Sequence, residues 1–387
     1  MNTINNKTYC QYAFNSIHWD VSGRTAPCCT FRGGNTPINL SISEYWDSEW
    51  LADVRQKMIN GEEVDGCQRC YEEERMGGTS MRERKQISSM DSIQEPDPVL
   101  ERVHITYSNI CNKTCNICRP YRSHLIGREY QKVIDTDSNN IWMKHKREDQ
   151  PYTDLTLKTI KFDGLDDEKI KDVENYVQSL KRIDLTGGEP FMHMEYIDKL
   201  LAMLVKNARQ DVKIVVATNG SWTKEILDKF SEFTDVRFNI SVDGIKELYE
   251  LVRSPHNWDW FSKKLDLLNE YPNIDRRYEA VINVFNVHQL IDIVKYFSPY
   301  PIGLSMLVNQ EYLGAWICPD HVLEKAGNEL REFGNFRFKK TGNYLLRCIH
   351  KNVEKDKTLF HEFIKTMEPI KKLKYQDYIP WSFDLVK

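Results

Sequence analysis

From residue 101 to about residue 310 the chain alternates between short β-rich runs and amphipathic helical stretches, and this alternation constrains the fold most. Parallel strands need long crossover connections, usually helices, so the pattern predicts a parallel sheet with helices packed on it and an α/β fold class. We expect strands at 102–107, 182–186, 212–218, 236–242, 278–285 and 302–308, and helices at 194–208, 223–233, 258–270 and 287–296. Six strands fit a partial barrel or an open wound sheet, and periodicity does not distinguish the two.

The regions around this alternation predict four segments. Residues 1–85 are rich in Cys, Gly and polar residues, with one helix expected at 43–59. Residues 86–99 have the Ser, Asp, Pro and Glu content of a linker, residues 100–310 form the α/β core, and residues 311–387 are helical and aromatic-rich. A long charged stretch at 130–177 interrupts the alternation as an insertion between the first two strands.

Composition narrows the classes of partner. The 387 residues carry a formal net charge of −4, which gives no indication of a broad nucleic-acid-binding surface. No stretch approaches the roughly twenty apolar residues that a membrane helix needs. The first residues show no basic segment followed by an apolar run. We therefore expect a cytoplasmic protein with neither a membrane nor a nucleic acid as partner.

Ten cysteines occur in the chain, and eight of them precede residue 120 in tight groups. Disulfide frameworks are typical of short secreted chains, whereas clustered cysteines in a long chain of this kind more often bind metal. The clustered cysteines are Cys10, Cys28, Cys29, Cys67, Cys70, Cys111, Cys115 and Cys118, and Cys318 and Cys348 stand apart. The spacing predicts metal sites in the first third of the chain.

Cys111, Cys115 and Cys118 follow the first expected strand of the core on one short loop. Three thiolates so close in sequence can bind three corners of a 4Fe–4S cluster and leave the fourth iron open for a chelating ligand. The alternatives are a zinc knuckle and part of a fully ligated electron-transfer cluster. Zinc normally takes four protein ligands, and the nearest further Cys or His is His124. The loop is therefore the candidate catalytic centre.

A Thr-Gly-Gly-Glu-Pro turn, residues 186–190, ends the second expected strand. Carboxyl ends of parallel strands carry the active sites of α/β barrels, so this turn is expected beside the cysteine loop. Gly187 and Gly188 let a backbone approach closely, and Glu189 can accept a hydrogen bond from an ammonium group of a ligand. By itself the turn could simply end a strand.

Together, the Cys-x3-Cys-x2-Cys loop and the Gly-Gly-Glu-Pro turn resemble the radical S-adenosylmethionine (SAM) superfamily in identity, order and strand context. The resemblance implies a partial (β/α)6 TIM-like barrel and a cluster whose fourth iron is chelated by SAM. It also implies SAM contacts for Gly187, Gly188, Glu189, Pro190, Asn219, Ser241, Asp243 and Arg253. Ile117 stands where the family usually has an aromatic residue near the adenine.

The N-terminal cysteines resemble the auxiliary-cluster modules called SPASM or twitch domains. In those modules a Cys precedes a Gly-x4-Cys hairpin, and Gly23 and Cys28 fit that spacing with Cys10 upstream. The resemblance implies a second iron–sulfur cluster on Cys10, Cys28, Cys67 and Cys70, with Cys29 as an alternate ligand. Here the module precedes the catalytic domain instead of following it. A structural zinc is the alternative.

The resemblance also implies a reaction. One electron from the reduced cluster splits SAM into methionine and a 5′-deoxyadenosyl radical, which removes a hydrogen atom from a peptide or protein side chain. An electron donor such as flavodoxin or ferredoxin is then expected as partner. Two alternatives stay open, namely a nucleotide or small metabolite as substrate and a non-catalytic iron–sulfur or zinc protein.

Other residues are weaker candidates. Residues 130–177 and the C-terminal aromatic residues Tyr344, Trp381 and Phe383 are either substrate-facing or simply packed. Cys318 and Cys348 fit buried thiols, with donation of a hydrogen atom to a product radical as the alternative role.

Overall fold

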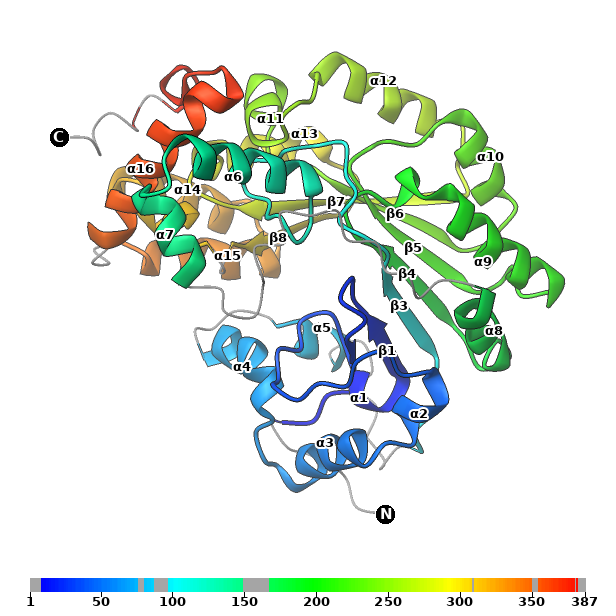
Figure 1. Ribbon diagram of the computed structural model, residues 1–387. Coiled ribbons are helices and arrows are strands. Elements are labelled where there is room, and N and C mark those ends of the chain that lie inside the picture. The colour runs from blue at the N-terminus through cyan, green and yellow to red at the C-terminus, as the bar shows by residue number, and fades with distance from the viewer. Residues whose placement is uncertain are drawn as a thin grey trace.

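One eight-stranded sheet organises the part of the chain that the computed structural model describes, namely residues 8–75, 80–86, 97–148, 167–307, 310–349, 354–379 and 381. The strands lie in the order β2-β1-β3-β4-β5-β6-β7-β8, and all neighbours pair in parallel except β1 and β2 (Figure 1). Their bounds are β1 Ser16–Trp19, β2 Thr25–Ala26, β3 Arg102–Thr106, β4 Arg182–Thr186, β5 Lys213–Thr218, β6 Val236–Ser241, β7 Ile274–Ile282 and β8 Ile302–Met306.

The expected α/β fold is confirmed, and the six strands predicted from the sequence correspond to β3 through β8. The strand predicted at 278–285 is displaced, because β7 begins at Ile274 and ends at Ile282. Residue 308, the last of the strand predicted at 302–308, lies outside the described residues.

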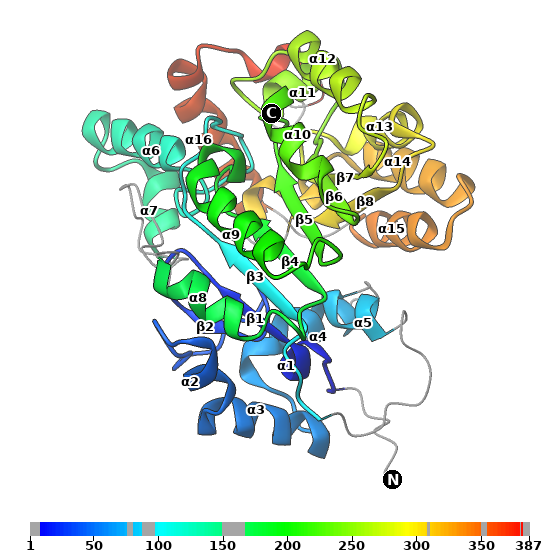
Figure 2. The ribbon, with the colours of Figure 1, turned by 90° about the vertical axis from the view of Figure 1, so that its right-hand side faces the viewer.

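Helices cover the outer face of this sheet, as Figure 2 shows for α9 and α10. In α9, Ile197, Leu200 and Leu204 recur at helical spacing and are fully buried, so one face of the helix is committed to the core. The helices that follow successive strands are α9 (Met194–Lys206), α10 (Lys224–Ser231), α11 (Lys246–Val252), α12 (Trp258–Leu268) and α13 (Leu290–Phe297). They match the four predicted helices and add the short α11.

The N-terminal region contributes a strand to the core sheet. Strand β1 pairs in parallel with β3, with His18 opposite His104. The buried rings of these two residues lie 4.6 Å apart. Nε2 of His18 is 2.9 Å from the Thr106 hydroxyl, and Nε2 of His104 is 2.9 Å from the Thr186 hydroxyl. The region therefore shares the barrel sheet. Of the predicted linker, residues 87–96 lie outside the described residues.

The single helix expected at 43–59 is wrong, because the structure has two helices there, α2 (Ile42–Trp46) and α3 (Glu49–Asn60). The Ser48 side chain accepts a hydrogen bond from the Leu51 amide, and its backbone is extended, so it caps the start of a new helix. Gly61 ends α3 at a φ of +80°. The remaining helices of this region are α1 (Tyr12–Asn15), α4 (Gln68–Arg75) and α5 (Met81–Gln86).

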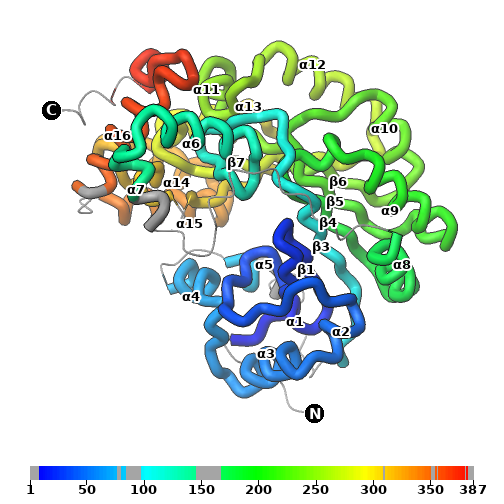
Figure 3. Tube along the Cα trace, in the orientation of Figure 1, coloured from blue at the N-terminus to red at the C-terminus, as the bar shows by residue number. Residues whose placement is uncertain are grey.

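The described parts of the 130–177 insertion pack on the C-terminal region or on the sheet-covering helices. Figure 3 shows α6 (His124–Thr136), α7 (Ile141–Glu148) and α16 (Glu354–Lys371) side by side. Buried Trp142 stacks edge-on against Tyr312 and Phe363, which joins these helices in a second core. Residues 149–166 lie outside the described residues. Helix α8 (Asp167–Asn175) contacts α9, and α14 (Asp320–Glu332) and α15 (Phe336–Arg347) form a hairpin.

Within the described residues, none of the helices combines the length and the apolar composition needed to cross a membrane.

Candidate active site

Four loops at the carboxyl ends of β3, β4, β5 and β6 carry the residues singled out from the sequence. Because the strands are parallel neighbours, their carboxyl ends lie along one edge of the sheet. Thr106, Thr186, Thr218 and Ser241 are the last residues of these strands, so each candidate motif begins where its strand ends. The predicted placement of the motifs at one edge is thus what the structure shows.

The cysteine loop is held by hydrogen bonds to the segment after α11. The Thr114 amide donates to the Ser254 carbonyl at 2.7 Å, and the Asn116 amide donates to the Val252 carbonyl at 2.9 Å. The Asn116 side chain donates to the Leu251 carbonyl at 2.8 Å. These bonds place the loop between its own strand and the helix that precedes Arg253.

The glycine turn packs directly against the backbone that leads into Cys111. The Gly188 amide donates to the Ser108 carbonyl at 2.7 Å, and the Glu189 amide donates to the Ile110 carbonyl at 2.9 Å. A Cβ at position 188 would lie only 2.0 Å from the Ile110 carbonyl oxygen, and Gly187 adopts a φ of +143°. The glycines therefore let the turn pack closely against the cysteine loop of the same chain.

The buried Glu189 side chain links the glycine turn to the end of β5 by hydrogen bonds. It is 1% exposed, and its carboxylate accepts from the Asn219 amide and the Thr218 hydroxyl, both at 2.7 Å. Burial raises the pKa of Glu189 to about 7, although these hydrogen bonds oppose the rise. The carboxylate is thus engaged within the protein before any ligand is considered.

Asn219 joins the Glu189 hydrogen bonds to the cysteine loop. Its side-chain amide donates to the Asn112 oxygen at 2.9 Å and lies 3.7 Å from the Cys111 sulfur. The Asn219 carbonyl is 3.2 Å from Nε2 of His256. Amide-to-sulfur hydrogen bonds stabilise thiolate charge, so Asn219 is placed to act on Cys111.

Asp243 and Arg253 form a buried ion pair with a nitrogen–oxygen distance of 2.6 Å. The other Asp243 oxygen accepts from the Val281 amide at 2.7 Å. Burial disfavours the charge on Arg253, but Asp243 opposes this effect and keeps the pKa of the guanidinium above its usual range. The two residues are therefore paired with each other, and Ser241 lies at the end of β6, two residues before Asp243.

The three loop thiols fit the donor set of an iron–sulfur cluster. Cys111 and Cys115 are each 8% exposed, and Cys118 is partly buried. Burial raises the pKa of Cys111, and the thiols of Cys115 and Cys118 raise it further, so the three thiols interact electrostatically. Such thiols lose their protons when they bind iron. Softness, burial and mutual proximity all suit the cluster that the superfamily implies.

The four N-terminal thiols predicted as cluster ligands also neighbour one another. Burial raises the pKa of Cys67, and Cys10, Cys28 and Cys70 raise it further. Cys29 differs, because it raises the pKa of Arg102 in β3 as well as that of Cys28. Cys10, Cys28, Cys67 and Cys70 therefore influence one another electrostatically. Among the described residues, no three Cys, His, Asp or Glu side chains are placed to hold a single metal ion.

Several residues near the cysteine loop carry no signal in the sequence. Lys371 and Tyr375, from the C-terminal region, bond to Thr114 and Asn116 of the loop, and Gln310 donates to the Ile117 carbonyl at 2.7 Å. These contacts join positions more than 190 residues apart, and no motif marks their C-terminal partners.

The weaker candidates are mostly packed. Tyr344 and Trp381 contact the second core, as does Ile117, and Phe383 lies outside the described residues. Cys318 and Cys348 are buried. Burial raises the pKa of Cys318, and the neighbouring Cys348 raises it further. Pro190 begins the short helical turn after Glu189.

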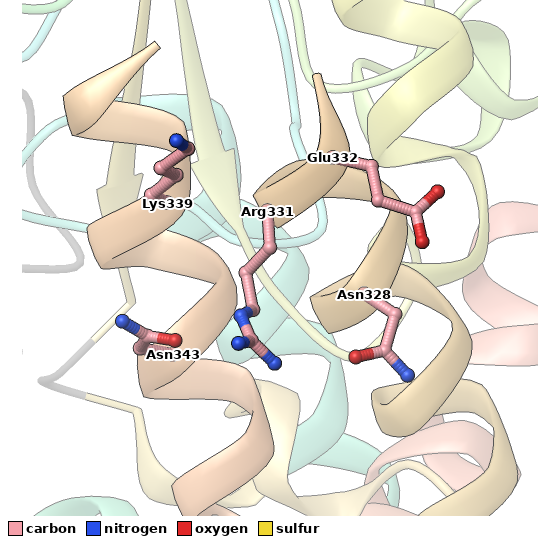
Figure 4. A pocket seen from close by; sticks show the side chains of 5 residues that line it. All are labelled: Asn328, Arg331, Glu332, Lys339 and Asn343. Atoms are coloured by element: carbon pink, nitrogen blue, oxygen red, sulfur yellow. The ribbon is translucent and has the colours of Figure 1, made fainter. Parts of the chain in front are cut away.

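A surface hollow lies away from these residues, between α14 and α15 (Figure 4). Its volume is about 460 Å³, and polar or charged residues line it. The lining residues are Asn328, Arg331, Glu332, Lys339 and Asn343. None of them belongs to the motifs singled out from the sequence.

Comparison with solved structures gives similar chains of low sequence identity. One is anSMEcpe with bound AdoMet, at 17% identity and a TM-score of 0.44, covering 61% of this chain and 58% of that chain. Another is Streptococcus suis SuiB bound to S-adenosylmethionine, at 13% identity and a TM-score of 0.36, covering 82% of this chain and 67% of that chain. This chain thus spans less than two thirds of anSMEcpe. Comparison with curated proteins gives no match.

A family model gives the decisive comparison. The model of the radical SAM superfamily matches residues 105–284. The match begins in β3 and ends after β7, so it contains the cysteine loop, the glycine turn and the Asp243–Arg253 pair. Residues 105–284 of this chain therefore match the radical SAM superfamily as a domain.

Proposed function

We propose that Cys111, Cys115 and Cys118 bind a 4Fe–4S cluster and that SAM binds at its iron without a thiolate. The observation that carries this proposal is the set of three thiols, two of them buried and one partly buried, on a loop hydrogen-bonded to the ends of β4 and α11. When bound, the cluster and SAM supply a 5′-deoxyadenosyl radical, formed with one external electron, which takes a hydrogen atom from the substrate.

The residues around the loop hold it and surround the SAM position. Glu189 fixes the end of β5 against the glycine turn, so Asn219 faces Cys111. The proposed SAM contacts are Gly187, Gly188, Glu189, Pro190, Asn219, Ser241, Asp243, Arg253 and Ile117. Arg253 is 12% exposed and keeps a positive charge that can attract a carboxylate of the ligand.

The N-terminal thiols are proposed to bind a second cluster. The ligands are Cys10, Cys28, Cys67 and Cys70, which neighbour one another, while Cys29 also acts on Arg102. Four thiolates would saturate a 4Fe–4S cluster, which suits electron transfer more than substrate binding. Because β1 pairs with β3, this site is tied to the strand that precedes the catalytic loop.

The substrate is proposed to be a peptide or protein side chain, in the cytoplasm, with flavodoxin or ferredoxin as electron donor. The support is the Gly23–Cys28 spacing, which resembles that of SPASM and twitch modules.

Iron counting tests the two-cluster proposal. After anaerobic reconstitution, we expect about eight irons per wild-type chain and about four in each of two variants. One variant carries Ala at Cys111, Cys115 and Cys118, and the other carries Ala at Cys10, Cys28, Cys67 and Cys70. A Cys318→Ala variant is the matched control and should keep all of its iron. Zinc in place of iron at the N-terminal site would contradict the second cluster.

A deuterium-transfer assay tests the substrate class. Extracts of fully deuterated cells are separated into a peptide fraction and a small-molecule fraction, and each is added to the enzyme with unlabelled SAM. Deuterium in 5′-deoxyadenosine with the peptide fraction alone supports the proposal. Deuterium with the small-molecule fraction alone would instead support the nucleotide or metabolite alternative.

A further inference from the structure

The C-terminal region also contacts the cysteine loop, through Lys371 and Tyr375. Nζ of Lys371, at the end of α16, donates to the Thr114 carbonyl at 2.5 Å and lies 3.0 Å from the Thr114 hydroxyl. The Tyr375 hydroxyl donates to the Asn116 side-chain oxygen at 2.9 Å. Thr114 and Asn116 flank Cys115 on both sides, so both contacts fix the middle ligand of the loop.

Lys371 is buried as a charged pair. Its side chain is 1% exposed, and Nζ lies 3.0 Å from one carboxylate oxygen of Glu129, whose side chain is 13% exposed. Burying an ammonium group is unfavourable unless it is paired and hydrogen-bonded, and here the carboxylate, a carbonyl and a hydroxyl all accept from it. An apolar side chain could fill the same space without that penalty, which indicates a role for the charge.

Lys371 contacts Thr114, the residue before Cys115, so its charge lies beside the proposed ligand loop. After burial, which raises the pKa of Cys115, the charges of Arg253, Lys371 and Lys113 lower that pKa and the Asp243 carboxylate raises it. Reduction adds one negative charge to a cluster, so a positive charge nearby favours the reduced form and a negative charge disfavours it. The charges of Lys371 and Glu129 therefore shift the reduction potential of the cluster in opposite directions.

We propose that Lys371 is a positioning residue that fixes Cys115 through Thr114 and that its charge, balanced by Glu129, sets the reduction potential of the catalytic cluster. The inference rests on the proposed cluster at Cys111, Cys115 and Cys118. It gives the C-terminal region a direct part in the electron-transfer step, in which an external reductant supplies one electron to the cluster.

Redox titration with dithionite, followed by electron paramagnetic resonance, tests the inference on the full chain. The signal is assigned as the one lost in the variant with Ala at Cys111, Cys115 and Cys118. We expect Lys371→Met to lower the midpoint potential of that signal and Glu129→Gln to raise it. Lys371→Arg, which keeps the positive charge, should restore the wild-type potential.

Opposite shifts separate the charge from a merely structural role, because loosening the loop would move both potentials in the same direction. Shifts of the same sign, or unchanged potentials with the cluster retained, would overturn the inference. If Lys371→Met does not retain iron, the test rests on Glu129→Gln alone. A midpoint potential that does not rise in Glu129→Gln would then overturn the inference. Failure of the proposed function is distinct, because the signal would then persist in the triple cysteine variant.

Discussion

Replacement of Gly188 by alanine is expected to separate the glycine turn from the cysteine loop and to abolish iron binding at the catalytic site. The added Cβ would lie 2.0 Å from the oxygen and 2.5 Å from the carbon of the Ile110 carbonyl, and a backbone cannot move aside as a flexible side chain does. The hydrogen bonds from Gly188 to Ser108 and from Glu189 to Ile110 would be lost as the turn moves.

We expect a loss of about 3 kcal/mol in the free energy of unfolding, together with about four fewer irons per chain after reconstitution. Urea denaturation of the apoprotein measures the first and iron analysis the second. Gly34→Ala is the matched control, because its added Cβ has no atom within 4 Å and its φ lies outside the left-handed region. Wild-type iron content and stability in Gly188→Ala would show that the turn does not brace the loop.

Replacement of Asp184 by asparagine is expected to destabilise the protein by about 3 kcal/mol, because it leaves a buried arginine without its carboxylate. Asp184 lies in β4 and accepts from Arg102 at 2.6 Å and from Arg182 at 2.6 Å. The Arg102 side chain is 12% exposed, so water replaces little of the lost interaction. The pair joins β3 to β4, the strands that carry the cysteine loop and the glycine turn.

The same carboxylate predicts acid lability. Burial alone would raise the pKa of Asp184, but Arg102 and Arg182 hold it well below its usual range. A pKa that is lower in the folded than in the unfolded state contributes stability above the unfolded value, near 4, and this contribution is lost as the pH falls further.

Urea denaturation at pH 7 and at pH 3.5 therefore should show a steeper loss for the wild type than for Asp184→Asn. Asp211→Asn is the matched control, because Asp211 pairs with Arg209 at the surface with a side-chain exposure of 65% and such pairs contribute little. Equal destabilisation by the two substitutions would contradict the account of the β3–β4 pair.

The parts of the site that the sequence predicted are local ones. The cysteine loop and the glycine turn are short motifs at strand ends, and the parallel arrangement of strands brings such ends together. The N-terminal thiol set was predicted from its spacing, which is typical of metal-binding cysteines, and a cluster on these thiols stays a prediction.

What the sequence could not predict depends on contacts between distant segments. Strand β1 has only four residues, too few for a periodic pattern, and it exists because it pairs with β3. Lys371 reaches Thr114 across 257 positions, and a lysine in an amphipathic helix gives no sign of being buried. The role of Gly188 was also open, since only the structure shows that the Ile110 carbonyl occupies the space of its absent side chain.

The most direct test of the central claim is SAM cleavage by the anaerobically reconstituted enzyme with dithionite, measured as 5′-deoxyadenosine. The account predicts 5′-deoxyadenosine from the wild type and none from the variant with Ala at Cys111, Cys115 and Cys118, while the variant with Ala at Cys10, Cys28, Cys67 and Cys70 still cleaves SAM. Equal cleavage by the wild type and the Cys111, Cys115 and Cys118 variant, or none by an iron-loaded wild type, would contradict it.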